Sequence, residues 1–230
     1  MREIPTADIV SLVWFVAVWI GYTWYADRGP QRARSLRAVM HTHRYEWMRR
    51  MLERDNRIVD ANILGNLLQS VSFFASTTLL ILAGLVTILG STDKAILLVR
   101  ELPFAARTSL VLWELKLLVL IVIFVHAFFK FTWALRQFNY CSVLVGAAPN
   151  PGGKAADDAY ARRAAEVSTL ASKDFNQGLR AYYLSLAALA WFISPWVFML
   201  ATTVVIAVLY WREYHSEALR TLEPAVGERR

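Results

Sequence analysis

Four long apolar segments dominate the pattern of the chain. They cover about residues 8–26, 66–90, 110–131 and 181–211. Each approaches or exceeds the roughly 20 residues that an α-helix needs to cross a bilayer. The pattern therefore predicts an all-α membrane protein with four transmembrane helices.

Two of these segments need a further decision. A cleaved signal peptide competes with a span at 8–26, but Glu3 offsets Arg2 and the segment ends in Trp and Tyr where cleavage requires small residues. We therefore expect a retained span. The last segment contains Pro195, which membrane helices tolerate, so we expect a kink there and no break.

The polar segment 31–64 contains no Gly or Pro and is predicted to be an amphipathic helix. Its apolar stripe has helical spacing and comprises Leu36, Met40, Trp47, Met51 and Ile58. No residue type stops this helix before the second span, so the two are expected to form one rod. Two placements stay open: the helix lies in the headgroup layer, or it packs against other helices or a second subunit.

The third span is also predicted to extend beyond the membrane. No Gly or Pro occurs within 108–145, so we expect the helix to end at Gly146. Residues 146–178 are then expected to hold a Pro- and Gly-rich loop and a short surface helix.

The distribution of basic residues predicts the orientation. Residues 27–60 hold nine Arg and five acids, and residues 130–180 hold seven basic residues and four acids. Because Lys and Arg accumulate on the inner side, we expect both segments in the cytoplasm and both termini outside a bacterial inner membrane.

Polar side chains gather where three helices meet the predicted cytoplasmic boundary. This candidate polar belt comprises Asn62, Asn66, Gln69, Arg136, Asn139, Tyr140, Asn176 and Arg180. Two interpretations stay open: the residues hydrogen-bond one another and fix the bundle, or they line a vestibule that favours anions.

Three ionisable residues lie deeper in the third span, namely Glu114, His126 and Lys130. Snorkelling accounts for Lys130, and for Lys116 beside them, without any function. Glu114 and His126 are candidates for a proton or cation relay.

Composition narrows the function classes. The chain is 57% hydrophobic with a net charge of +7. In a membrane protein, Lys and Arg mainly set the orientation in the bilayer, so this charge is not by itself a sign of nucleic-acid binding. One cysteine, Cys141, rules out an internal disulfide, and no phosphate loop, HExxH or CxxC motif occurs. We therefore expect no metal, no cofactor and no enzymatic activity.

Three runs of the sequence are distinctive, namely residues 66–77, 128–141 and 175–183. They resemble a membrane-protein family of bacteria and plants that is known only as a domain of unknown function. The resemblance covers most of the chain and implies a multi-span membrane protein, with no established activity and no site residue to carry over.

Two functions remain in competition. The first is a homo-oligomeric channel- or transporter-like protein with a pathway along the second and third spans. The second is a non-catalytic membrane scaffold or accessory subunit whose cytoplasmic helices bind one another or a partner protein. A membrane-bound enzyme lacks any acid, base or nucleophile constellation.

Overall fold

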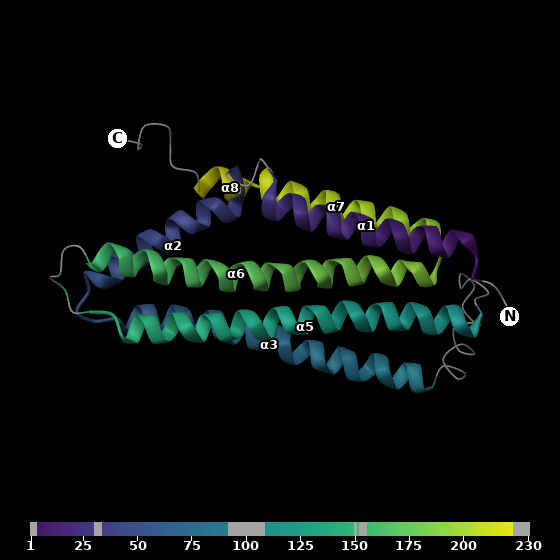
Figure 1. The fold of residues 1–230 in the computed structure, drawn as a ribbon, viewed down its shortest axis with the longest axis horizontal. Helices are drawn as coiled ribbons and strands as arrows, with labels where there is room; N and C mark the ends of the chain where they lie inside the picture. The colour runs from purple at the N-terminus through teal and green to yellow at the C-terminus, as the bar shows by residue number, and fades with distance from the viewer. Residues whose placement is uncertain (1–3, 30–33, 92–108, 150, 152–155, 223–230) are drawn as a thin grey trace. The chain divides into compact units, whose positions relative to one another are not determined.

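The computed structural model of the protein describes residues 4–29, 34–91, 109–149, 151 and 156–222, which form helices joined by short turns. No strand occurs within these ranges. The helices (Figure 1) are α1 (Thr6–Arg28), α2 (Leu36–Leu52), α3 (Ile58–Gly90), α5 (Leu110–Gly146), α6 (Ala156–Leu189), the short 3-10 helix η2 (Ala190–Phe192), α7 (Pro195–Tyr214) and α8 (Glu217–Leu222).

Four helical segments are long and apolar enough to cross a membrane. They are Thr6–Arg28, Ile58–Gly90, Leu110–Gly146 and Pro195–Leu222. The first three contain the first three predicted spans. The predicted end of the third helix at Gly146 is confirmed, because α5 is continuous over 37 residues.

The prediction of one kinked span over 181–211 is wrong, because this stretch contains two helices. α6 ends at Leu189, and the amides of Ile193 and Ser194 both donate to the carbonyl of Ala190. Ser194 then caps a new helix, since its Oγ accepts from the amide of Trp196 and its carbonyl accepts from Phe198. Pro195 occupies the first helical position, where its missing N–H costs nothing. Figure 1 shows α7 running back opposite to the last part of α6.

The continuous rod predicted from residue 31 is also wrong, because α2 ends at Leu52 and α3 begins at Ile58. Asn56 caps the new helix through its Oδ1, which accepts from the amide of Ile58. Asp60 bridges the break, since its Oδ1 accepts from Trp47 Nε1 at 2.7 Å and from Arg54 Nη1 at 2.6 Å. The break is therefore a defined turn held by side chains.

The short surface helix predicted within 146–178 is the beginning of α6, which runs unbroken from Ala156 to Leu189. The residues from Ala147 to Pro149 are non-helical, as expected of the predicted loop, and 152–155 lie outside the described residues.

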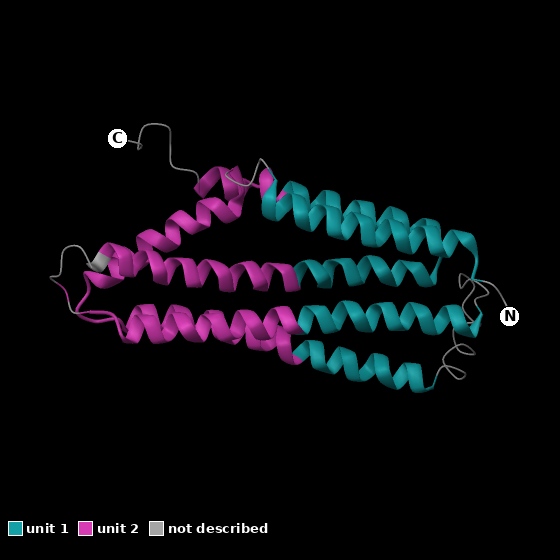
Figure 2. Cartoon of the chain, viewed as in Figure 1, with its two compact units in different colours: residues 1–30, 77–128, 179–211 teal, residues 31–76, 129–178, 212–230 magenta. Residues whose placement is uncertain are grey.

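The chain divides into two compact units (Figure 2), and α3, α5, α6 and α7 contribute residues to both. Unit 1 comprises residues 1–30, 77–128 and 179–211, and unit 2 comprises residues 31–76, 129–178 and 212–230.

Contacts within unit 1 give the helix directions. Phe15 contacts Phe198 and Tyr25 contacts Tyr210, so α1 and α7 run parallel. In contrast, α6 runs antiparallel to α1. Near the start of α1, Asp8 contacts Trp191, and near its end Asp27 contacts Arg180. The start of α1 and Tyr210 of α7 therefore lie toward opposite ends of unit 1.

Unit 2 has a core of small and aromatic side chains between α5 and α6. Ala161, Ala164 and Ala165 are fully buried on α6, and Cys141 Sγ lies 3.9 Å from the carbonyl of Ala164. Small residues allow close approach of two helices. Elsewhere in unit 2, the rings of Phe74, Phe131 and Phe175 pack together, with centroids 5.4–5.7 Å apart.

We predict that Gly178→Ala destabilises the protein. A Cβ at this position would lie 2.5 Å from the ring of Phe131, which is fully buried and has little room to move. Overpacking of this kind costs about 1–3 kcal/mol, which exceeds the roughly 0.5–1 kcal/mol that alanine gains in a helix. The measurement is the thermal midpoint in detergent.

Gly65→Ala is the matched control, since a Cβ there meets nothing within 4 Å and should leave the protein equally or more stable. A Gly178→Ala variant as stable as the Gly65→Ala variant would contradict the packing of α5 against α6.

Candidate functional site

Most of the predicted polar belt lies on the outer surface of unit 2. Six of its members are exposed side chains on α3 and α5: Asn62, Asn66, Gln69, Arg136, Asn139 and Tyr140. Asn176 is half-buried on α6, and Arg180 is buried but belongs to unit 1. The structure therefore does not gather these eight residues into one interior site.

The burial pattern of α5 explains this outcome. Its buried apolar residues in unit 2 recur at spacings of three and four, and they are Phe131, Ala134, Phe138, Cys141 and Val145. A second series at similar spacing is exposed on another face of the same helix: Phe129, Trp133, Arg136, Tyr140 and Val143. Three belt members of α5 lie on this outer side.

The exposed series contains an ordered cluster of three side chains. Arg136 Nε donates to Tyr140 Oη at 2.7 Å, and the guanidinium lies 5.9 Å from the centre of the Trp133 ring. The arginine is thereby held in place between two aromatic side chains on the surface of unit 2.

Unit 2 also contains a half-buried polar group, which is centred on Asp174. Its Oδ1 accepts from Lys130 Nζ at 2.9 Å and its Oδ2 accepts from Gln137 Nε2 at 2.8 Å. Lys130, predicted to snorkel, is therefore paired. Sequence reasoning missed Asp174, because its partners lie 37 and 44 residues away along the chain.

A second buried group joins three helices of unit 1. Asp8 Oδ1 accepts from Trp191 Nε1 at 2.8 Å, and Lys116 Nζ donates to the carbonyl of Trp191 at 2.8 Å. The Lys116 ammonium lies 3.7 Å from Asp8, with only 2% of its side chain exposed. Snorkelling therefore does not describe Lys116, which is enclosed beside a carboxylate.

A third charge pair links α1 to α6 within unit 1. Arg180 Nη1 lies 3.7 Å from Asp27 Oδ1, and its guanidinium lies 5.2 Å from the centre of the Tyr22 ring. Both side chains are at least 85% buried. Buried ion pairs of this kind add little net stability, but the loss of one partner leaves an uncompensated charge.

The proposed relay residues are not brought together. His126 is exposed, and its ring contacts the edge of Trp19 with centroids 5.5 Å apart. Glu114 is half-buried, and no described residue pairs with it. The two lie twelve residues apart on α5, so they cannot exchange a proton directly.

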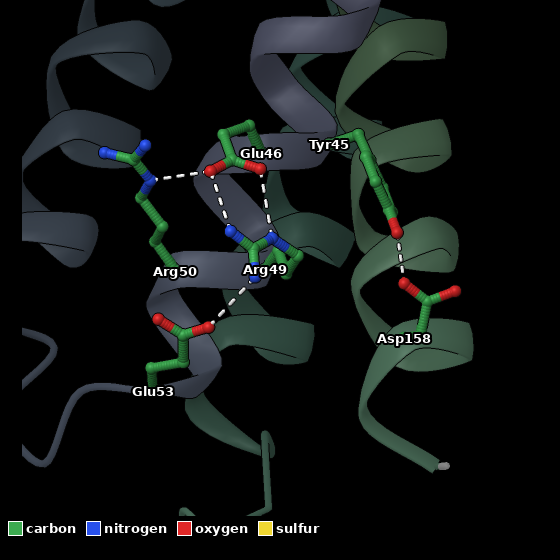
Figure 3. A network of polar contacts seen from close by, with 6 residues as sticks. All are labelled: Tyr45, Glu46, Arg49, Arg50, Glu53 and Asp158. Atoms are coloured by element: carbon green, nitrogen blue, oxygen red, sulfur yellow. Dashed lines mark hydrogen bonds and ion pairs between the residues drawn. The ribbon is translucent and has the colours of Figure 1, made fainter. Parts of the chain in front are cut away.

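The surface of unit 2 carries a solvated ionic network between α2 and α6 (Figure 3). Glu46 accepts from Arg49 and Arg50, and these hydrogen bonds lower the pKa of Glu46 to about 2. Tyr45 donates to Asp158 on α6. Exposed pairs of this kind contribute little to stability, so we assign no function to them.

A metal centre finds no support within the described ranges, where no cluster of three His, Cys, Asp or Glu side chains occurs. His41 hydrogen-bonds Thr169, whereas His43 contacts the carbonyl of Leu222. Cys141 is fully buried.

Comparison with protein families gives one match, to the family described as a protein of unknown function, DUF599, over residues 10–218. The chain belongs to this family. The resemblance inferred from the three sequence runs is thereby confirmed, and DUF599 carries no established activity. Neither the curated proteins nor the solved structures include a match.

We predict that Lys116→Met destabilises the protein by about 3–5 kcal/mol, because it leaves the buried Asp8 without its cation. The double variant Asp8→Asn with Lys116→Met should lose less than the sum of the two single changes. Thermal or denaturant unfolding in detergent measures all three variants.

Glu114→Gln is the control, since it removes a charge two residues away on the same helix and should cost less than about 1 kcal/mol. Additive effects of the Asp8 and Lys116 changes would show that this pair is not coupled.

Proposed function

We propose that this protein is a non-catalytic membrane scaffold or accessory subunit that self-associates through the exposed faces of α3 and α5 in unit 2. The observation that carries this proposal is the exposed cluster of Trp133, Arg136 and Tyr140. Trp, Tyr and Arg are the residue types that dominate protein–protein contact energies.

The spacing of the exposed series supports a second copy as the partner. Phe129, Trp133, Arg136, Tyr140 and Val143 follow one another at intervals of four, three, four and three. This is the a/d pattern with which two helices pack along a seam. The exposed amides of α3, among them Asn62 and Asn66, are able to hydrogen-bond across such an interface.

The paired charges favour a packed interior over a pathway through one chain. Lys116, Lys130 and Arg180 each face a carboxylate of their own unit. Aromatic rings fill the space beside the Asp174 group in unit 2. A single chain is thus unlike a channel, whose pathway requires polar groups that face water.

The distribution of charge supports a cytoplasmic unit 2 in a bacterial inner membrane, since most Lys and Arg of the sequence lie in its segments. In α1, Asp8 and Asp27 are 19 residues apart, about 28 Å along a helix, which is close to the thickness of the hydrocarbon core.

We propose that the end of α6 also crosses the membrane, which gives five crossings. In this topology the start of α1 is outside and the end of α7 is cytoplasmic. It replaces the expectation from the sequence that both termini lie outside.

A homo-oligomeric channel or transporter is the second candidate. The buried Asp8–Lys116 pair favours it, because ionisable groups within a membrane commonly mark transport pathways. Ion flux into liposomes that falls in Glu114→Gln and His126→Ala variants would support transport. Flux equal to that of empty liposomes would remove this candidate.

We predict that Trp133→Ala weakens self-association by about 2 kcal/mol or more, roughly thirtyfold in the dissociation constant. The measurement is energy transfer between donor- and acceptor-labelled copies in liposomes at increasing dilution. Trp196→Ala is the matched control, because this tryptophan of α7 is also exposed but belongs to unit 1.

Equal association of wild type and Trp133→Ala would contradict the proposal and indicate that Trp133 and Tyr140 contact lipid headgroups. A wild-type protein that stays monomeric at all protein-to-lipid ratios would contradict it as well.

A further inference from the structure

The inner face of α2 carries three basic side chains. Arg37, His41 and Arg44 follow at spacings of four and three, and the same face continues to Met48 and Met51, which are fully buried. The basic groups are consequently turned toward the interior of unit 2. His41 Nδ1 lies 3.0 Å from Thr169 Oγ1, which fixes this part of α2 against α6.

The carboxylates near this face do not balance its charge. Glu213, at the end of α7, lies 3.8 Å from Arg37 Nε. The carboxylates of α6 are engaged elsewhere or exposed. Asp158 is bound to Tyr45 and Arg162. Asp174 is bound to Lys130 and Gln137, and Glu166 is exposed. Lys173 adds a further positive charge on α6. Because each of these carboxylates is bound elsewhere or exposed, Arg44 has no acidic counterpart among the described residues.

Two buried polar atoms have no hydrogen-bond partner among the described residues, and each belongs to a residue close in sequence to the His41–Thr169 contact. They are Arg44 Nη1, three residues after His41 on α2, and Ser168 Oγ, next to Thr169 on α6. Ser168 is fully buried. Burial also lowers the pKa of Arg44, as expected of a cation that has lost water without gaining an anion. Buried donors that lack a partner are rare in folded proteins, so an acceptor from outside the chain is expected.

We propose that Arg44, His41 and Ser168 bind a phosphate group, either the headgroup of an anionic phospholipid or free phosphate. The planar guanidinium of arginine matches two phosphate oxygens, and a serine hydroxyl donates to a third. Glu213, which contacts the same face of α2, is only two residues beyond Trp211, an exposed aromatic residue at the end of the apolar part of α7. Tryptophans at such positions lie at headgroup level, which favours the lipid.

The test is binding of short-chain phosphatidylglycerol, phosphatidylcholine and inorganic phosphate to the full-length protein in a neutral detergent, followed by thermal stabilisation. Wild type should be stabilised by phosphatidylglycerol and not by phosphatidylcholine. Arg44→Gln should weaken phosphatidylglycerol binding at least tenfold, and Ser168→Ala should weaken it severalfold. Arg44→Lys keeps the positive charge but cannot donate two parallel hydrogen bonds to a phosphate. Its affinity for phosphatidylglycerol should therefore lie between those of wild type and Arg44→Gln.

Arg50→Gln is the matched control, because Arg50 is an exposed arginine of the same helix that is already paired with Glu46. It should bind phosphatidylglycerol like wild type. Without ligand, Arg44→Gln should be at least as stable as wild type, since the substitution removes an uncompensated buried charge. A purely structural Arg44 would instead lower the thermal midpoint when replaced.

The outcomes separate the two phosphate sources. Competition by millimolar inorganic phosphate would identify a free-phosphate site, and its absence would identify a lipid site. Equal phosphatidylglycerol binding by wild type and Arg44→Gln would overturn the proposal, as would equal stabilisation by the two lipids. Trp133→Ala should bind phosphatidylglycerol normally, so failure of self-association leaves this test intact.

Discussion

The pairing of two carboxylates of α1 with groups on α5 and α6 is the constraint on which the arrangement of unit 1 depends. Asp8 meets Lys116 and Trp191, and Asp27 meets Arg180. A carboxylate enclosed in an apolar bundle must find a cation or donors, because desolvation without them is costly. Both pairs form only if α6 runs antiparallel to α1 and brings Trp191 beside the start of α1. The chain must therefore turn before Pro195, and α7 then lies parallel to α1.

The same requirement separates the inside of unit 2 from its surface. Asp174 binds Lys130 and Gln137, while small residues such as Ala164 let α5 and α6 approach closely. The exposed amides of α3, such as Asn62 and Asn66, and the cluster around Trp133 lie on the outside of unit 2. There we propose that they contact a partner helix, since they do not line a pathway inside the unit. At Arg44 the internal pairing is incomplete among the described residues, and there we infer an external anion.

Several features of the fold were predictable from the sequence because they depend on local signals. Three spans and the long α5 follow from apolar length and from the lack of Gly and Pro. The turn at Ser194–Pro195 was also signalled, as a capping serine followed by a first-position proline, but the apolar flanks were interpreted as one span. The break before Ile58 was likewise preceded by a turn pair, Asp55–Asn56.

The orientation of α5 and the identity of the charge partners were not predictable in this way. In unit 2 this helix has two faces of similar spacing, one through Phe131 and Ala134 and another through Phe129 and Trp133. The face that is buried packs against small residues of α6 and against the rings of Phe74 and Phe175, which are distant along the chain. Lys116 was interpreted as snorkelling because Asp8 lies 108 residues away and no local pattern connects them.

The most direct test of the account is the distance between spin labels at Leu186→Cys and Val208→Cys, two exposed positions of α6 and α7, measured in lipid with Cys141 replaced by serine. The antiparallel arrangement of α6 and α7 predicts less than about 20 Å, since packed helix axes lie about 8–10 Å apart. One continuous helix over 181–211 would place the labels about 33 Å apart at the standard rise per residue, and that distance would contradict the antiparallel arrangement.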